Sequence, residues 1–220
     1  PLDAYQAQCR GGEGRSGAPV REEDSIEHLL VANSHHTILC FSNRGRVFWL
    51  KVYEIPVASR GAKGRPLVNL LRLEGDERIT SLLPVGSFDA DRFVFMATSD
   101  GTVKKTPLDA FSRPRGNGLI AIDLGADDHL VGTAITDGSS DVLLFSSGGK
   151  AVRFKESAVR AMGRTAHGVR GMRLGAGQRV VSLIVPDESA SQVLTLSANG
   201  YGKRTATGDF PLHGRAGQGV

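Results

Sequence analysis

The sequence predicts an all-β fold, a propeller-like array of four-stranded blades, and three observations support this. One hairpin pattern occurs four times, at 37–52, 93–108, 141–156 and 192–207. The glycines in the four hairpin turns recur every 48 to 56 residues along the 220-residue chain. The segments between hairpins hold short strand-like runs. Strands repeated at this period are typical of a propeller, and the matching order of the repeated features disfavours a β-sandwich with coincidental turns.

The hairpin at 141–156 shows the repeated pattern most clearly. An apolar run, Val142–Phe145, precedes a turn containing Gly149, and apolar residues then alternate with Arg153 and Lys155. This pattern predicts a buried strand, a glycine turn, and a second strand with one basic face in solvent. A hydroxyl residue stands three positions before each turn glycine. The four pairs are Ser42 and Gly45, Thr98 and Gly101, Ser146 and Gly149, and Ser197 and Gly200.

A second glycine marks each repeat, 17 to 19 residues after the turn glycine. These marker glycines are Gly64, Gly118, Gly168 and Gly219. An arginine lies four residues before three of them, whereas Arg115 lies three residues before Gly118. The three are Arg60, Arg164 and Arg215. Each marker therefore predicts a basic loop between two blades.

A further apolar run completes each repeat and is expected to be a strand. The four runs are Ile26–Ala32, Ile79–Val85, Leu130–Ile135 and Val180–Val185. The predicted blades are therefore three full repeats, 37–85, 93–135 and 141–185, and two partial ones, 1–32 and 192–220. No linker divides them, so residues 1–220 are expected to form one domain. A helical turn is expected within Glu156–Met162.

Charge and composition exclude several classes of function. The net charge is +4 and the pI is near 9.3. Acidic residues gather in the turns between repeats, where solvated charge is the expected state. Nothing resembles a nucleophile elbow or a set of metal ligands, so we expect neither a catalytic nor a metal site. No apolar run reaches the ~18 residues of a membrane helix, and no signal peptide opens the chain.

The chain has two cysteines, Cys9 and Cys40, which is too few for a disulfide framework and favours a reduced, cytoplasmic protein.

Basic residues recur after the turn glycines and around the marker glycines, which predicts a repeated basic stripe. Turning roughly 40 base pairs of DNA through about 180° costs on the order of 10 kcal/mol. Several blades that each offer two or three cations to phosphates would supply this energy, without reading bases. The expected phosphate ligands are Arg10, Arg60, Lys63, Arg65, Lys104, Lys105, Arg113, Arg115, Arg153, Arg164, Lys203, Arg204 and Arg215. The side chains on the hairpins are expected to alternate outward from the core.

A glycine-rich loop near the start of the chain is a further candidate. Residues 8–15 read Gln-Cys-Arg-Gly-Gly-Glu-Gly-Arg, and the glycines permit close approach of the backbone to a partner. The backbone amides of such a loop can hold a phosphate, although the Lys-Ser/Thr end of a Walker loop is missing. Its candidate residues are Gln8, Arg10, Gly11, Gly12, Gly14 and Arg15.

These residues resemble the C-terminal domain of DNA gyrase A, the β-pinwheel of bacterial type IIA topoisomerases. The likeness is densest in 29–48, 60–71, 95–106, 152–164 and 199–206. The hallmark of that family is a box, Gln-Arg-Arg-Gly-Gly-Lys-Gly. Residues 8–14 match it except at Cys9 and Glu13, which replace an arginine and the lysine. The box here therefore has two fewer cations and one more anion, and we expect this copy to hold DNA less strongly.

The resemblance implies a domain that binds, bends and wraps double-stranded DNA without sequence specificity, in support of ATP-dependent negative supercoiling. Its partners would be the rest of the gyrase A polypeptide and the gyrase B polypeptide, in an A2B2 heterotetramer in the bacterial cytoplasm, at the nucleoid. ATP and Mg²⁺ would be used elsewhere in that enzyme. The family usually has six blades, and its hairpins reach across to neighbouring blades.

Three alternatives remain open. The first is the corresponding domain of topoisomerase IV, which binds DNA without full wrapping. The second is a protein-docking propeller, which would expose an apolar or aromatic patch on one face. The third, an enzyme propeller, would need a polar, acidic central pocket.

Overall fold

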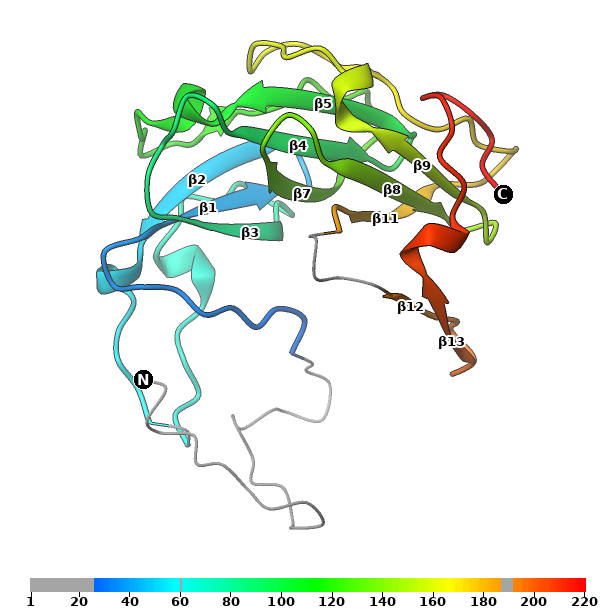
Figure 1. Cartoon of the computed structure of the whole chain (residues 1–220). Coiled ribbons are helices and arrows are strands. Elements are labelled where there is room, and N and C mark those ends of the chain that lie inside the picture. Colours follow the sequence, from blue (N-terminus) through cyan, green and yellow to red (C-terminus); the bar gives the residue numbers. More distant parts are fainter. Residues whose placement is uncertain (1–25, 60, 187–191) are drawn as a thin grey trace.

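The computed structural model describes residues 26–59, 61–186 and 192–220, which form β-strands and short 3-10 turns without any α-helix (Figure 1). The all-β prediction is confirmed, and all four predicted hairpins are present. They are β1 (Thr37–Ser42) with β2 (Arg46–Lys51), β4 (Phe93–Thr98) with β5 (Thr102–Pro107), β8 (Asp141–Ser146) with β9 (Ala151–Lys155), and β12 (Gln192–Leu196) with β13 (Gly202–Ala206).

The run that completes each full repeat forms a strand on the outer edge of its hairpin. These strands are β3 (Ile79–Val85), β7 (Leu130–Thr136) and β11 (Val180–Ile184). The expected strand at Ile26–Ala32 is wrong, because this stretch has no regular structure. Of its apolar residues, Leu30 packs on a core cluster, whereas Ile26, Leu29 and Val31 are exposed.

Short 3-10 turns follow the hairpins. They are η2 (Val52–Glu54), η3 (Leu67–Asn69), η4 (Leu108–Phe111), η5 (Glu156–Ala158) and η6 (Thr207–Asp209). The helical turn expected within Glu156–Met162 is therefore confirmed as η5.

The fourth strand of each complete sheet comes from the next repeat. Sheet 1 has the order β3-β1-β2-β6, and sheet 2 has the order β7-β4-β5-β10. Both β6 (Leu119–Ile120) and β10 (Val169–Arg170) directly follow a marker glycine of the next repeat. Sheet 3 (β11-β8-β9) is extended in the same way, because Ala151 and Val220 exchange two backbone hydrogen bonds of 2.8 Å. The sheets thus cross the boundaries of the sequence repeats.

The two glycines of each repeat are explained by this exchange. The carbonyl oxygen of Gly101, in the β4–β5 turn, accepts hydrogen bonds from the amides of Gly171 (2.7 Å) and Met172 (3.1 Å). A Cβ at Gly168, which has φ +108°, would lie 2.7 Å from the carbonyl oxygen of Val103. Positive φ and close backbone contact both favour glycine, so turn and marker glycines together seat the exchanged strand.

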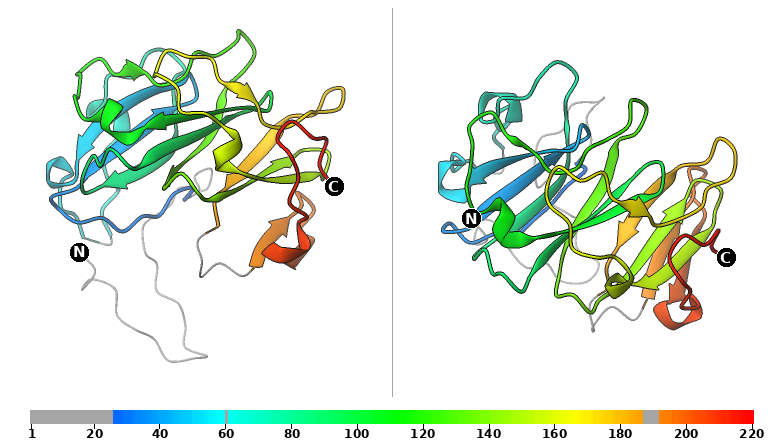
Figure 2. Two further views of the ribbon diagram at one scale, coloured as in Figure 1. Left: turned by 45° about the horizontal axis from the view of Figure 1, so that its top comes forward. Right: turned by 90° about the horizontal axis from the view of Figure 1, so that it is seen from above.

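Successive sheets follow one another side by side (Figure 2). Apolar side chains fill the space between them. On β4, Val94 and Met96 face the core shared with sheet 1, whereas Phe95 and Ala97 face the core shared with sheet 3. Sheet 2 is therefore buried on both faces, as alternation along a strand requires when both sides are covered. The last hairpin, β12–β13, forms a two-stranded sheet beside sheet 3.

Candidate nucleic-acid interface

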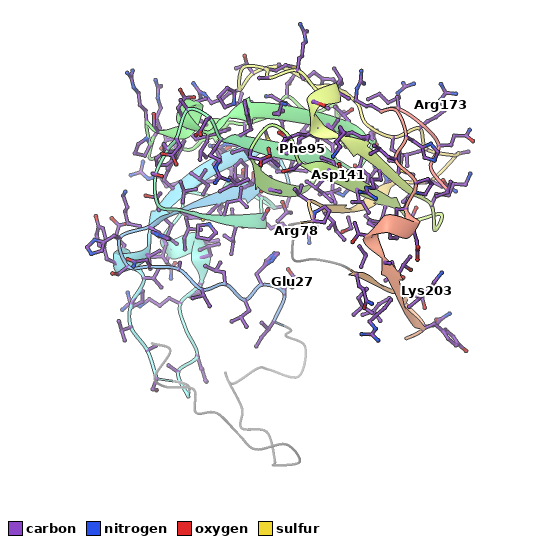
Figure 3. The ribbon with its side chains drawn as sticks, in the orientation of Figure 1. Glu27, Arg78, Phe95, Asp141, Arg173 and Lys203 are labelled. Carbon is purple, nitrogen blue, oxygen red and sulfur yellow. The ribbon has the colours of Figure 1, made fainter. Side chains whose placement is uncertain are left out.

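The connectors 108–118, 156–168 and 207–219 run along one rim of the array, at the top of Figure 1 and toward the viewer in the right-hand panel of Figure 2. Each leaves its own hairpin and crosses to the preceding sheet. Arg113, Arg115 and Arg160 on these connectors are exposed, and Arg164 and Arg215 are half-buried. Figure 3 shows side chains extending outward along this rim. The loop with Lys63 and Arg65, both exposed, lies elsewhere, below the sheets in Figure 1.

Ion pairing separates the connector arginines from the other cations. In the described part of the chain, every ion pair involves a residue of a hairpin or an acidic turn. The cations are Arg44, Arg46, Lys105, Arg153, Lys155 and Arg179. Among the described residues, Arg113, Arg115, Arg160 and Arg164 have no carboxylate partner. Within the described part of the chain, no carboxylate compensates their charge, which leaves it available to attract an anion.

Sequence reasoning left Arg160 out of the expected phosphate ligands, and it also left out two further cations on this rim. Arg170 and Arg173 are exposed and have no ion pair in the described ranges. Figure 3 shows Arg173 at the upper rim. Their position just after the marker Gly168 was the available signal, because the exchanged strand β10 carries this stretch to the edge of sheet 2 opposite β7.

The expectation that Lys104 and Lys105 point outward is wrong. The Lys104 side chain is fully buried, and its Nζ donates hydrogen bonds to the carbonyl oxygens of Ala121 (2.7 Å) and Arg164. Burial, reinforced by the nearby charge of Arg164, lowers the pKa of Lys104 to about 8. Sheet 2 has a neighbour on each face, so neither side of β5 is free for a solvated lysine.

Lys105 points to the other face of β5, where it is also buried. Its Nζ lies 3.8 Å from Oε1 of the fully buried Glu156 and donates to the Glu156 carbonyl oxygen at 3.3 Å. It also lies 4.9 Å from the centre of the Phe93 ring. Burial raises the pKa of Glu156, and the neighbouring Thr136 side chain and the charge of Lys105 only partly oppose this.

Arg153, the corresponding cation on β9, also makes internal contacts. Its guanidinium binds Asp141, with 2.8 Å from Nε to Oδ2, and Nη1 donates to the carbonyl oxygens of Thr207 (2.9 Å) and Phe210 (3.2 Å). Burial opposes ionisation of Asp141, but hydrogen bonds from Lys155 and Arg153 outweigh it and lower its pKa. The cations after the turn glycines in sheets 2 and 3 therefore join blades instead of forming an outer stripe.

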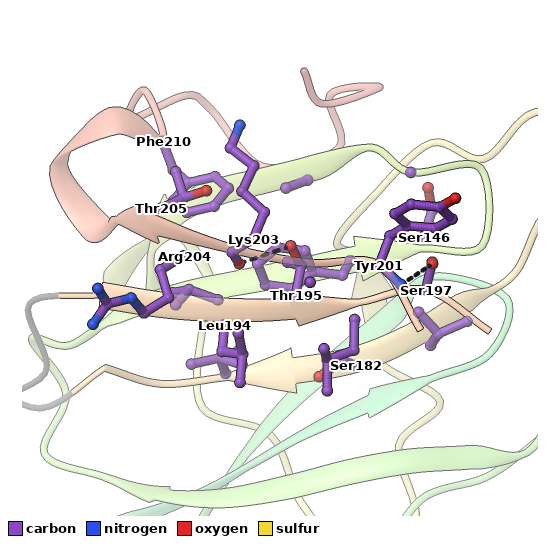
Figure 4. A pocket seen from close by; sticks show the side chains of 18 of the residues that line it. Ser146, Ser182, Leu194, Thr195, Ser197, Tyr201, Lys203, Arg204, Thr205 and Phe210 are labelled. Atoms are coloured by element: carbon purple, nitrogen blue, oxygen red, sulfur yellow. Dashed lines mark hydrogen bonds between the residues drawn. The ribbon is translucent and has the colours of Figure 1, made fainter. Parts of the chain in front are cut away.

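On the last hairpin, Lys203 and Arg204 are exposed and lack ion pairs in the described chain (Figure 4). They border a groove between sheet 3 and β12–β13, where Leu194, Leu196 and Tyr201 are also exposed. In the other sheets, β1, β4 and β8 each pair with a further outer strand, whereas in the described chain β12 pairs with β13 alone. The apolar side chains of this hairpin are therefore less covered than those of the complete sheets.

The acidic turns contact the hairpin turns. Glu74, Asp76 and Asp127 are exposed, as expected for solvated carboxylates, whereas Glu77 is an exception. Glu77 is buried; its Oε1 accepts a hydrogen bond from Ser42 Oγ at 2.6 Å, and its Oε2 lies 3.2 Å from Nη1 of Arg46. Ser99 Oγ donates to Asp128, in the turn before β7, at 2.7 Å. These two carboxylates thus bind a cation or hydroxyl groups of the hairpin turns.

Several predicted residues lie outside the described residues. They are Gln8, Arg10, Gly11, Gly12, Gly14, Arg15 and Arg60. Cys9 also lies there, while Cys40 is a buried free thiol whose pKa burial raises to about 12. Within the described ranges, no acidic, histidine and cysteine side chains gather as a metal site would require. In the same residues, no helix is long and apolar enough to span a bilayer.

Comparison with known proteins identifies the family. A family model described as "DNA gyrase C-terminal domain, beta-propeller" matches residues 1–33, 36–86, 92–137, 140–187 and 191–220. The chain belongs to this family. The DNA gyrase A polypeptide of Salmonella typhimurium is 59% identical over all 220 residues, and that of Escherichia coli K12 is 58% identical. The chain spans about a quarter of these relatives, since it covers 25% of each.

Solved structures with this fold include members of two topoisomerase classes. A C-terminal domain of DNA topoisomerase IV has a TM-score of 0.81 at 28% identity, over 93% of this chain and 64% of that one. A DNA gyrase A C-terminal domain has a TM-score of 0.78 at 25% identity, over 99% and 70%. The fold is common to both classes, whereas the high sequence identities are to gyrase A polypeptides.

Proposed function

We propose that this chain binds double-stranded DNA without sequence specificity and bends it along the rim formed by the connectors. The observation that supports this proposal most directly is that the connector arginines have no carboxylate partner among the described residues. Arg113 and Arg115 lie on one connector, Arg160 and Arg164 on the next, and each pair is placed by a different blade. Equivalent loops of successive blades follow a curve, so a duplex that contacts them in turn is bent. Arginines that bind phosphates fix the path of the duplex without reading its bases.

Within a larger protein, this bending would make the chain the DNA-wrapping domain of a gyrase. The holoenzyme would be an A2B2 complex with the gyrase B polypeptide, an ATP-dependent type II topoisomerase that introduces negative supercoils in the bacterial cytoplasm, at the nucleoid. The chain itself would contribute no catalytic group or cofactor, and ATP and Mg²⁺ would act in other parts of the enzyme. The 58–59% identity to gyrase A sequences supports this function over that of topoisomerase IV.

A topology assay tests the proposal. The full-length protein is bound to nicked circular plasmid, the nick is sealed by ligase, and the linking number is read after the protein is removed. Wrapping is expected to shift the linking number in proportion to the protein bound. Binding without any shift would favour the topoisomerase IV function, and no binding would contradict the proposal. The matched control replaces Arg113, Arg115, Arg160 and Arg164 by Gln, which is expected to reduce the shift strongly.

A further inference from the structure

At one equivalent position in three repeats, the side chain contacts the next blade. Trp49, Lys105 and Arg153 each stand four residues after a turn glycine, on β2, β5 and β9. Across the hairpin, Trp49 pairs with Leu39 and Lys105 with Phe95, which pack in the core shared with the following sheet. These side chains therefore point toward the next blade.

The three side chains share one kind of acceptor despite their different chemistry. Trp49 Nε1 donates to the carbonyl oxygen of Phe111 at 2.7 Å, at the end of η4. Lys105 Nζ donates to the carbonyl oxygen of Glu156, the first residue of η5. Arg153 Nη1 donates to the carbonyl oxygens of Thr207, the first residue of η6, and of Phe210, just after it. Each acceptor lies where the connector of the next blade begins. The carbonyl of Phe111, the last residue of η4, is free to accept because the last carbonyls of a short helical turn lack partners within it. The carbonyls of Glu156 and Thr207 already accept the amides of Val159 (2.8 Å) and Phe210 (3.3 Å), so there the outside donor adds a second hydrogen bond to the turn.

We infer that this position is a positioning site for the DNA-binding connectors, resting on the function proposed above. Trp49, Lys105 and Arg153 set where each connector starts and so aim the arginines that follow within the same loop. On the first connector, Arg113 and Arg115 come two and four residues after Phe111. A cation held in place before binding loses less conformational entropy when it meets a phosphate. Loss of the donor is therefore expected to weaken phosphate contact without removing any charge.

The first connector offers the sharpest test. The second and third connectors have an additional backbone link, from the Met162 amide to the Lys105 carbonyl and from the His213 amide to the Arg153 carbonyl, both 2.8 Å. In the described chain, no such backbone bond joins β2 to residues 108–116. Trp49 is thus the link between β2 and the start of the first connector.

The experiment uses Trp49→Phe in the full-length protein. This variant keeps an aromatic ring and the net charge, and it removes the indole N–H. We expect the slope of log affinity for a linear duplex against log salt concentration to fall by about one to two, since each lost phosphate contact contributes ~0.9. In the free protein, amide hydrogen exchange is expected to become faster at Ser112, whose amide donates to the Asp109 carbonyl oxygen at 3.0 Å.

The control is Ile38→Val, on the opposite face of β1, where it packs in a different core cluster. This is a conservative loss of one buried methylene group, a perturbation of similar size to the loss of one hydrogen bond. It should leave the salt slope unchanged. If Trp49→Phe changes neither the slope nor the exchange rates beyond this control, the inference is wrong.

A double-mutant cycle makes the test specific. In a protein that already carries Arg113→Gln and Arg115→Gln, Trp49→Phe is expected to have no further effect on the slope, because the two groups act through the same contacts. Additive effects would overturn the positioning role. Failure of the proposed function is distinguishable, because the unmodified protein itself would then show no salt-dependent binding.

Discussion

Lys104 Nζ and the carbonyl oxygen of Ala121 form a 2.7 Å hydrogen bond in a place with no solvent exposure. The same ammonium group binds the carbonyl oxygen of Arg164, so one lysine joins the segment just after β6 to the connector 156–168. The cation that the sequence assigned to the DNA surface is thus a link beneath that surface.

The buried Lys104 makes the stability of the protein depend on alkaline pH. Its pKa is about 8 in the folded protein and 10.5 in the unfolded chain, so the unfolded state binds more protons between these values. The free energy of unfolding is therefore expected to rise with pH in this window, by about 3 kcal/mol in total at about 1.4 kcal/mol per pKa unit. Denaturant unfolding from about pH 7 to above pH 10 measures it, with Lys104→Met as reference.

The difference in unfolding free energy between the unmodified protein and Lys104→Met should increase across this window. The control is Lys155→Met, since the Lys155 side chain is 52% exposed. A difference that stays constant for Lys104→Met would contradict the assignment of the titrating group.

The Lys105–Glu156 pair predicts a second pH dependence, of opposite direction. Lys105→Met leaves the buried carboxylate of Glu156 without its cation, which is expected to destabilise the protein by about 3–5 kcal/mol at neutral pH. At about pH 5 the cost should be smaller, because the pKa of Glu156 is already raised and its loss of the cation raises it further, so that the group is protonated.

Thermal unfolding of Lys105→Met at the two pH values measures this cost. Adding Glu156→Gln should restore much of the lost stability at neutral pH. An equal cost at both pH values would show that the uncompensated charge is not the cause.

The connector arginines predict where the binding energy for DNA lies. Arg113→Gln with Arg115→Gln, and Arg160→Gln with Arg164→Gln, are each expected to lower the salt slope by about two, at ~0.9 per phosphate. Because the two pairs lie on different connectors, their effects should be nearly additive. The measurement is a binding titration of a linear duplex at several salt concentrations.

The control pair is Arg44→Gln with Arg179→Gln. These arginines are also partly exposed, but they are paired with Asp76 and Asp100. Their removal should change the slope little. Equal losses from the control and connector pairs would leave only diffuse attraction to a basic surface.

The glycine-rich box, which lies outside the described residues, carries a prediction from sequence alone. Glu13→Lys replaces an anion by a cation where the family has a lysine. If the loop contacts phosphate, the variant should bind DNA more tightly, and its salt dependence should be steeper by close to two, roughly one unit per charge changed. An unchanged slope would mean that this loop does not meet DNA.

The hairpins and turn positions were predictable from sequence because they depend on local chemistry. Positive φ at Gly45 and Gly101, and the alternation along β8 and β9, are properties of a few adjacent residues. Only the family resemblance implied contact across blades; the residue pattern did not predict the exchanged strands, since β6 and β10 have two residues each and no pattern of their own. Their existence depends on a neighbouring edge in the preceding repeat, far away in sequence.

The candidate site was predicted in part for a related reason. Alternation along β5 indicated one solvent face, but the packing of sheets on both sides decides that Lys104 and Lys105 are buried. The shared role of Trp49, Lys105 and Arg153 was hidden because the residue types differ and only their donor capacity is common. The connector arginines, in contrast, lie in loops, where local sequence is a better guide to exposure.

Strand exchange also has a consequence for how the array unfolds. In a simple solenoid, a terminal repeat can melt alone, because each repeat completes its own structure. Here, melting of residues 192–220 also removes the bond partners of Ala151 and Arg153 and so opens the edge of sheet 3. The smallest cooperative unit is therefore a pair of consecutive repeats, and damage to one blade weakens the blade before it more directly than the blade after it.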